Sequence, residues 1–251
     1  MTRNGLVVEG LSVVFPGGMQ ALRHVNLSVD KGEIVGLVGE SGSGKSTLGR
    51  VIVGLQNSYS GTVQFGEEVL APRRTRAQRS AIQMVFQDPY ASLDPRMTVW
   101  QMLRELMAVH RIGNGQQDRR QQCEELMRRV HLPVSLLDSR PTSMSGGQRQ
   151  RVAIARALTV NPRFLVGDEP TAALDVSVQA GIINLFADLR QEMGLSQLFI
   201  SHNLAVVRSL CDRVAVIYRG EIVEMAPTAA IFEAPQHDYT RQLLAAAPDL
   251  P

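Results

Sequence analysis

The sequence predicts an α/β fold that combines a core of alternating strands and helices, an antiparallel β subdomain and an inserted α-helical subdomain. The apolar run over residues 34–38 is typical of a buried parallel strand, and the residues beyond the loop that follows it have helical spacing. Residues 88–162 differ from the rest because helical periodicity replaces strand–helix alternation. We therefore expect a single domain over residues 1–251. Residues 1–87 and 163–251 form its α/β core with the β subdomain, and residues 88–162 form the helical subdomain.

The composition is ordinary for a soluble globular protein, with 44% hydrophobic and 20% charged residues. No apolar run approaches the ~18 residues of a membrane span, and Met1–Asn4 does not begin a signal peptide. We therefore expect a protein of the cytosol or of the cytosolic side of a membrane. The net charge of +2 does not indicate nucleic-acid binding. Cys123 and Cys211 lack paired spacing, which argues against a disulfide framework or a zinc site.

Short strand patterns before residue 88 predict the β subdomain and the first core strands. A basic run over Arg73–Arg76, extended by Arg79, has no interleaved aromatic residues. We interpret it as a solvated loop rather than a nucleic-acid site. The expected strands are Leu6–Val14, Val25–Val29, Ile34–Val38, Thr62–Phe65 and Ile82–Phe86.

The segment Gly39–Thr47 fits the phosphate-loop pattern, with Gly39, Gly44, Lys45 and Ser46 at the required spacing. Glycines let such a loop wrap a polyphosphate, and the amides at the following helix start point at its oxygens. Lys45 is expected to reach the β- and γ-phosphates, and the Ser46 hydroxyl to ligate Mg²⁺. A plain Gly-Ser turn is the alternative, but the strand before and the helix after favour nucleoside triphosphate binding.

Two segments of the helical subdomain, Val99–Ile112 and Asp118–Val130, have helical spacing. Six of the ten methionines lie in or near them, either as gap-filling core residues or as an adaptable docking surface. Trp100, the only tryptophan, is the candidate anchor of such a surface. The six are Met84, Met97, Met102, Met107, Met127 and Met144.

An apolar strand over Arg163–Asp168 ends in the adjacent carboxylates of Asp168 and Glu169. Such a strand delivers one carboxylate to the Mg²⁺ shell, and the next faces the γ-phosphate. Strands that end in Asp-Glu are common, so this pattern alone is a weak signal. Together with the phosphate loop upstream it strongly indicates a nucleotide site. The expected elements that follow are a helix over Val176–Glu192, a strand over Gln197–Ser201, a helix from Asn203, and a hairpin of Val214–Tyr218 with Glu221–Glu224.

The segment Met144–Gln148 precedes a predicted helix over Arg149–Leu158. Ser145 is a good N-cap, and the pair Gly146-Gly147 is expected to expose backbone amides at the positive end of the helix. This would be a second anion site. An ordinary capped helix is the alternative, which explains Ser145 but not the glycine pair.

With these motifs in this order, the sequence resembles the ATPase subunit of ATP-binding cassette (ABC) transporters over essentially its whole length. The resemblance implies a P-loop NTPase core of the ABC ATPase type, ATP and Mg²⁺ as ligands, and ATP hydrolysis coupled to transport. Departures are small. Met144 stands where Leu is most common, Gly167 where a bulkier residue is usual, and Asn203 where Asp is common.

The resemblance also implies the roles of individual residues. Phe15 resembles the adenine-stacking aromatic, Asp168 the Walker B aspartate that binds Mg²⁺, and Glu169 the catalytic glutamate. Gln87 resembles the Q-loop glutamine next to Mg²⁺, and His202 the switch histidine; both are expected to take part in catalysis. The remaining nucleotide ligands come from the Walker A loop (Gly39, Ser41, Gly42, Gly44, Lys45, Ser46 and Thr47), the signature motif (Ser145, Gly147 and Gln148) and Asp175 of the D-loop Ala173–Asp175.

Two segments, Gln87–Arg96 and His237–Leu244, resemble the importer branch for oligopeptides, dipeptides and nickel. Some members carry a C-terminal iron–sulfur cysteine cluster. This sequence ends at Pro251 without one, so we expect the shorter of the two sibling subunits.

The importer interpretation implies a peripheral protein at the cytoplasmic face of the membrane. Its expected partners are a second ATPase subunit, identical or a sibling, two transmembrane permeases and, indirectly, an extracytoplasmic solute-binding protein, with no nucleic acid. An exporter ATPase is the nearest alternative. A cassette ATPase that acts on ribosomes or nucleic acid is more distant, because such proteins usually fuse two cassettes or add basic or coiled-coil segments.

Overall fold

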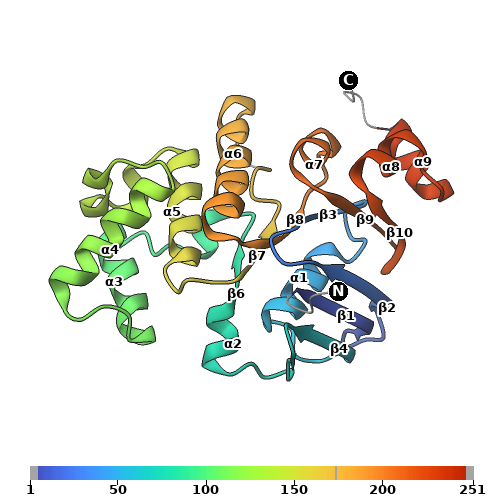
Figure 1. Cartoon of the computed structure of the whole chain (residues 1–251), viewed down its shortest axis with the longest axis horizontal. Helices are drawn as coiled ribbons and strands as arrows, with labels where there is room; N and C mark the ends of the chain where they lie inside the picture. Colours follow the sequence, from blue (N-terminus) through green and yellow to red (C-terminus); the bar gives the residue numbers. More distant parts are fainter. Residues whose placement is uncertain (1–4, 173, 247–251) are drawn as a thin grey trace.

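The computed structural model describes residues 5–172 and 174–246, and Figure 1 shows their arrangement. A four-stranded antiparallel sheet has the order β2-β1-β4-β5. Along β1, buried residues alternate with more exposed ones over most of the strand, which fits a sheet with one face in the core. The bounds are β1 (Leu6–Val14), β2 (Gln20–Val29), β4 (Ser60–Phe65) and β5 (Glu68–Val69).

The second sheet has six strands in the order β10-β9-β3-β8-β7-β6. Its strands run parallel except β10, which pairs antiparallel with β9. Every residue of β3, β7 and β8 is buried, as expected of strands covered on both faces. The bounds are β3 (Ile34–Val38), β6 (Ile82–Val85), β7 (Phe164–Asp168), β8 (Ser196–Ile200), β9 (Arg213–Tyr218) and β10 (Glu221–Pro227).

Two hydrophobic cores cover the two faces of the six-stranded sheet. One contains residues of the antiparallel sheet and of α1, and the other contains residues of the helical segment and of α6 and α7. In Figure 1 the antiparallel sheet accordingly lies below β3, and α6 and α7 lie above it. The helices of the core are α1 (Lys45–Val53), α6 (Val176–Met193), α7 (Leu204–Leu210), α8 (Thr228–Glu233) and α9 (Asp238–Ala245).

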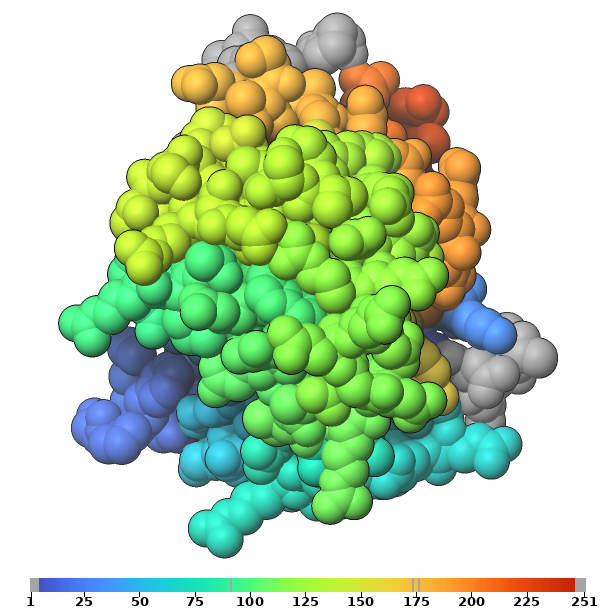
Figure 2. Space-filling model, turned by 90° about the vertical axis from the view of Figure 1, so that its left-hand side faces the viewer, coloured from blue at the N-terminus to red at the C-terminus, as the bar shows by residue number. Residues whose placement is uncertain are grey.

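The helical segment projects from the core next to β6 and β7 (Figure 1), and its α3 and α4 occupy much of the face in Figure 2. Thr98 and Ser145 form capping boxes at the starts of α3 and α5, which fixes where these helices begin. The elements are η1 (Pro89–Ala91), α3 (Val99–His110), α4 (Gln116–Arg129), η2 (Val134–Asp138), η3 (Pro141–Ser143) and α5 (Gly146–Leu158).

The methionines of this region fill the cores. Five of the six are at most 9% exposed, and Met97 packs partly buried against the same core. Trp100 is also partly buried, and the guanidinium groups of Arg104 and Arg120 lie 5.8 and 5.4 Å from its ring centroid. The structure therefore favours the core interpretation of the methionines, whereas the role of Trp100 as a docking anchor stays a prediction.

The expectation that Arg73–Arg76 and Arg79 lie in a solvated loop is wrong in part: Arg73, Arg76 and Arg79 are exposed, but Arg74 is buried, and Arg76 and Arg79 belong to a helix. Residues from Arg76 form α2 (Arg76–Ala81), which begins at a capping box on Thr75. Arg74 is only 4% exposed because its guanidinium donates to the Val51 carbonyl at 3.0 Å and to the Ala71 carbonyl. The buried arginine thus supplies a partner to Val51, one of the last carbonyls of α1. Among the described residues, no helix combines the length and apolar character needed to cross a bilayer.

Candidate nucleotide site

The predicted phosphate and carboxylate motifs meet at one edge of the six-stranded sheet. Because β3, β8 and β7 are parallel neighbours, the segments that follow their carboxyl ends lie side by side. The phosphate loop follows β3, Asp168 ends β7, and His202 follows β8. The Ser46 hydroxyl donates to Asp168 Oδ1 at 2.9 Å, which joins two motifs 122 residues apart.

Two glycines of the phosphate loop are required by the backbone. Gly39 has φ 155° and Gly44 has φ 110°, which glycine adopts far more readily than other residues. A Cβ at Gly39 would lie 2.2 Å from the Ile217 carbonyl oxygen, and one at Gly44 would lie 2.7 Å from that of Ala21. The loop is thus wrapped tightly against β2 and β9.

Lys45 is held inside this loop. Its Nζ donates to the carbonyls of Gly39 at 2.8 Å and Glu40 at 2.7 Å. The side chain is buried, and burial lowers the pKa of Lys45, while the carboxylates of Glu169 and Asp168 act to raise it. An ammonium with only two carbonyl partners in a closed loop retains a strong attraction for a phosphate anion.

A cavity of about 590 Å³ opens in front of the loop. It brings together most of the predicted nucleotide ligands, which are Phe15, Ser41, Gly42, Gly44, Lys45, Ser46, Thr47, Gln87 and Glu169. Six further lining residues were not anticipated: Met19, Gln20, Ala21, Arg23, Arg219 and Gly220. They come from the turn before β2, from β2 itself and from the β9–β10 hairpin. The hairpin is visible in the sequence, but its position against β2 is not.

Glu169 and His202 form a pair beside the loop. His202 Nδ1 lies 3.0 Å from Glu169 Oε2, and the Glu169 amide donates to the Ile200 carbonyl at 3.0 Å. Glu169 has φ 49°, a left-handed conformation uncommon for a non-glycine residue. Asp168 is buried, and burial raises its pKa above the ordinary range of an aspartate. The two adjacent carboxylates therefore have different surroundings and different partners.

The signature motif lies apart from this cavity within one chain. Ser145 Oγ accepts from the Gln148 amide at 3.3 Å and caps α5, as predicted. Gly147 is buried, and a Cβ there would lie 2.4 Å from Val178 Cγ1 of α6, so close packing explains this glycine. Asp175 is exposed at the start of α6. Ala173 of the predicted D-loop lies outside the described residues.

Two departures from the family pattern have structural reasons. A Cβ at Gly167 would lie 3.1 Å from the Phe186 ring, which packs edge-on against Phe199, so Phe186 occupies the space of a larger side chain. Asn203 accepts from the amides of Ala205 and Val206 through its Oδ1, and thereby caps α7. An aspartate could accept the same two bonds.

A glycine-rich loop between a parallel strand and a helix, with an aspartate of a neighbouring strand on its serine, is the arrangement of a phosphate-loop NTPase. The family model for ABC transporters matches residues 22–172, and the chain belongs to the ABC transporter family. It is an ATP-binding and ATP-hydrolysing cassette. The signature helix α5 lies inside the matched region.

Similar proteins of known name cover nearly the whole chain. A putative peptide import ATP-binding protein of Brucella ovis is 47% identical over 92% of this chain and 73% of its own length. The oligopeptide transport ATP-binding protein OppF of Bacillus subtilis is 44% identical over 92% of this chain and 77% of its own length. AmiF of Streptococcus pneumoniae, also named an oligopeptide transport ATP-binding protein, is 42% identical over 99% and 83%.

Solved structures agree with this fold. CbiO1 of Clostridium perfringens, described as part of the ABC transporter complex cbiONQ, has a TM-score of 0.81 and 28% identity over 97% of this chain and 95% of its own. The ATP-binding cassette MJ0796, solved as a dimer with ADP and Pi, has a TM-score of 0.79 and 29% identity over 89% and 98%.

Proposed function

We propose that this chain is the ATPase subunit of an ABC importer that drives the uptake of peptides or of a related small solute such as a nickel complex. The observation that carries the proposal is the 42–47% identity, over 92–99% of the chain, to one putative peptide import ATP-binding protein and two oligopeptide transport ATP-binding proteins. The sequence segments Gln87–Arg96 and His237–Leu244 support the same branch.

In the proposed complex, the cavity in front of the phosphate loop binds ATP. Phe15 stacks on the adenine from one side of the cavity, and Lys45 exchanges its carbonyl partners for the β- and γ-phosphates. The first amides of α1 have no partner within the helix, so they are available to phosphate oxygens. In this assignment, the backbone amides and the single ammonium group of the loop are the groups that bind the phosphates.

The donor set fits Mg²⁺. Ser46 and Asp168 offer a hydroxyl and a carboxylate 2.9 Å apart, and Gln87 lines the same cavity with an amide. The described residues hold no group of three or more His, Cys, Asp or Glu side chains that could bind a metal. Mg²⁺ in nucleotide sites needs none, since it combines one or two carboxylates with phosphates and water. When bound, Mg²⁺ neutralises charge that develops on the phosphates.

Glu169 and His202 are the groups we assign to hydrolysis. Glu169 lines the cavity, which supports the proposal that its carboxylate orients and deprotonates the attacking water. His202, which holds Glu169 Oε2 in this structure, is 64% exposed at its side chain and is assigned to the γ-phosphate. The reaction then depends on positioning and electrostatics rather than on a covalent intermediate.

The signature residues require a second cassette subunit, identical or a sibling. Ser145, Gly147, Gln148 and Asp175 do not belong to the residues that line the cavity of their own chain. We assign them to the nucleotide of the partner, so that two chains enclose two ATP molecules. The coupling to transport follows from this closure.

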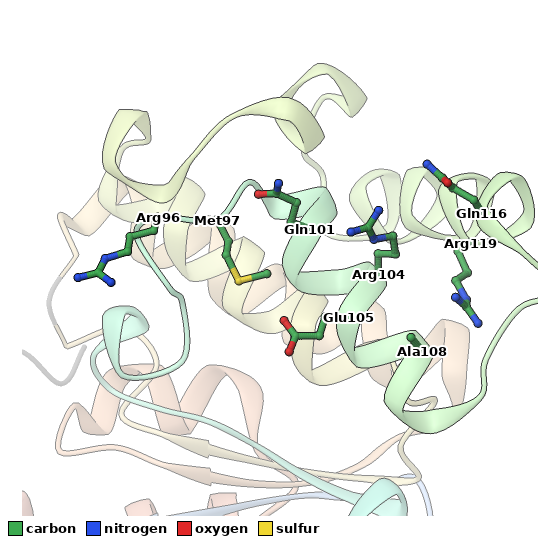
Figure 3. Close-up of a pocket in the computed structure, with 8 residues that line it drawn as sticks. All are labelled: Arg96, Met97, Gln101, Arg104, Glu105, Ala108, Gln116 and Arg119. Atoms are coloured by element: carbon green, nitrogen blue, oxygen red, sulfur yellow. The ribbon is translucent and has the colours of Figure 1, made fainter.

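The helical segment is the surface we assign to two transmembrane permeases. A hollow of about 650 Å³ runs along α3 (Figure 3). Gln101, Arg104 and Glu105 of α3 line it together with Arg119 of α4 and Arg96 of the preceding loop, so it presents mainly cationic and amide groups. Such a surface suits a polar, partly acidic cytoplasmic loop. An extracytoplasmic solute-binding protein would act only indirectly, and the chain would sit at the cytoplasmic face.

The test is transport itself. We expect the chain, co-expressed with the permeases and binding protein proposed as its partners, to support ATP-dependent uptake of labelled peptides into vesicles. Lys45→Ala should abolish uptake while the complex still assembles. Export in the same vesicles, or a failure of the permeases to co-purify with the chain, would contradict the importer assignment.

A further inference from the structure

The phosphate loop is bonded to the last helix of the described chain. The Glu40 amide donates to the Tyr239 hydroxyl at 3.0 Å, across 199 positions of sequence. Glu40 is the second residue of the loop, and Tyr239 belongs to the first turn of α9. Tyr239 is only 5% exposed, so this is an interior contact. Among the predicted nucleotide ligands there is no residue of α9.

Tyr239 is itself fixed from several sides. Its ring stacks on Tyr218 at the end of β9, with centroids 4.1 Å apart and planes at 28°. Its amide donates to His237 Nδ1 at 3.1 Å, which caps α9. Glu224 of β10 accepts from the amides of Gln236 and His237 at 2.8 and 3.0 Å and so holds the start of the helix. The hydroxyl that meets Glu40 therefore has a defined position.

The same hairpin reaches the loop from the cavity side. The Gly220 amide donates to the Ser43 carbonyl at 3.0 Å, and the Arg219 guanidinium lies 5.0 Å from the centroid of the Tyr218 ring. Arg219 also lines the nucleotide cavity. The stacked rings of Tyr218 and Tyr239 thus connect the cavity wall at Arg219 with the loop backbone at Glu40.

We propose that Tyr239 is a positioning residue for ATP: its hydroxyl holds the Glu40 peptide, and through it the loop backbone, in the form that receives the phosphates. The inference rests on the phosphate-binding role proposed above for this loop. The Glu40 N–H and the Gly39 carbonyl belong to one peptide group. Tyr239 therefore holds the same peptide group that binds Lys45, because Lys45 Nζ donates to Gly39 O. Lys45 Nζ also donates to Glu40 O of the next peptide group. Loss of the hydroxyl would let this end of the loop change its amide directions, with no loss of a phosphate ligand.

The experiment compares Tyr239→Phe with Tyr218→Phe in the full chain. Tyr239→Phe removes only the hydroxyl and keeps the stacked ring. Tyr218→Phe removes the hydroxyl of the other ring and leaves the bond to Glu40 intact. We expect Tyr239→Phe to raise the Kd for ATP by about 3–10-fold, the size of one lost hydrogen bond. We expect Tyr218→Phe to stay within about twofold of the parent, and both to melt within a few degrees of it.

Amide hydrogen exchange supplies a second measurement. Peptides that contain residues 39–44 should exchange faster in Tyr239→Phe than in the parent and in Tyr218→Phe. An unchanged Kd for ATP in Tyr239→Phe, with or without a lower Tm, would overturn the proposal and reduce Tyr239 to an anchor of α9. An equal loss of affinity in both variants would overturn it too, because removing a hydroxyl that does not contact Glu40 would then cost as much as removing the one that does. A parent that binds no ATP would refute the proposed function itself.

Discussion

At the residue scale, Lys45 has a closely matched control. The sequence contains only one other lysine, Lys31, which is exposed in the turn between β2 and β3. We expect Lys45→Ala to weaken ATP binding by roughly 10–100-fold, since a charged hydrogen bond contributes about 1.5–3 kcal/mol. Lys31→Ala should bind like the parent. Equal ATP affinity of the two variants in a direct titration would contradict the phosphate-loop assignment.

Asp168 leads to a prediction about stability and pH. Burial raises its pKa above the ordinary value, so the folded state prefers the protonated carboxyl, and the ionised form opposes folding above the folded-state pKa. Asp168→Asn should therefore raise the Tm near pH 7.5 without nucleotide and metal. The gain should shrink as the pH falls through the folded-state pKa and vanish below the unfolded-state pKa, because the Asp168 carboxyl is then neutral in both states.

The same Asp168→Asn variant should lose Mg²⁺-dependent ATP hydrolysis, since an amide replaces a carboxylate ligand. A stabilised protein without activity is the expected outcome of a strained functional site. Thermal melts from pH 4 to 8, together with an ATPase assay, check both parts. A lower Tm at every pH would show that the carboxylate stabilises the fold, contrary to the account.

The residues of the candidate site differ in how far their positions could be predicted from the sequence. The positions of Lys45, Ser46 and Asp168 were predictable because the phosphate-loop spacing and the strand that ends in Asp168 are both visible in the sequence. Arg23 and Arg219 carry no motif. They reach the cavity because β2 and the β9–β10 hairpin lie side by side, with the Arg23 amide donating to the Gly220 carbonyl at 2.8 Å. A contact made by tertiary pairing leaves no local pattern.

At the element scale, the strands and long helices followed their periodicity closely. The β1 strand has the predicted bounds, and α3, predicted over Val99–Ile112, ends at His110 because Arg111 adopts a left-handed conformation. The helix α2 was not predicted because the arginine-rich run was interpreted as a loop, although Thr75 forms a capping box there. The burial of Arg74 was not predicted because it depends on a hydrogen bond to the backbone of Val51, far away in the sequence. A hydrogen bond between a charged side chain and a backbone carbonyl far away in the sequence leaves no local sequence pattern.

The contact between α5 and α6 gives the element-scale prediction. Gly147→Ala should lower the Tm by roughly 2–12 °C, because its Cβ would lie 2.4 Å from Val178 Cγ1 and overpacking costs about 1–3 kcal/mol. Val178→Ala in the same chain should restore most of the loss. If the double variant melts like Gly147→Ala alone, the clash with Val178 is not the cause.

The activity of the double variant separates two roles of this glycine. The added methyl group would point at Val178 inside the chain, and the backbone amide of residue 147 is kept. We therefore expect ATP hydrolysis to recover together with the Tm. A recovered Tm with hydrolysis still lost would mean that the nucleotide of the partner chain itself requires glycine at this position.

At the scale of the whole molecule, the two halves of the proposed site lie on different parts of one chain. The cavity with the phosphate loop lies at the edge of the six-stranded sheet, and Ser145 caps α5 in the helical segment. The described chain thus offers an ATP site and a separate capped helix that we assign to a second copy or a sibling. ATP would join two such chains, and hydrolysis would release them.

Glu169→Gln tests this central claim most directly, because it removes the proposed base and keeps the size and polarity of the side chain. We expect the variant to bind ATP, to lose at least about 100-fold in turnover, and to elute as a dimer with ATP but as a monomer without it. Light scattering during size-exclusion chromatography, run with ATP and with ADP, provides the measurement. A variant that hydrolyses ATP within a few-fold of the parent, or that binds ATP and stays monomeric, would contradict the account.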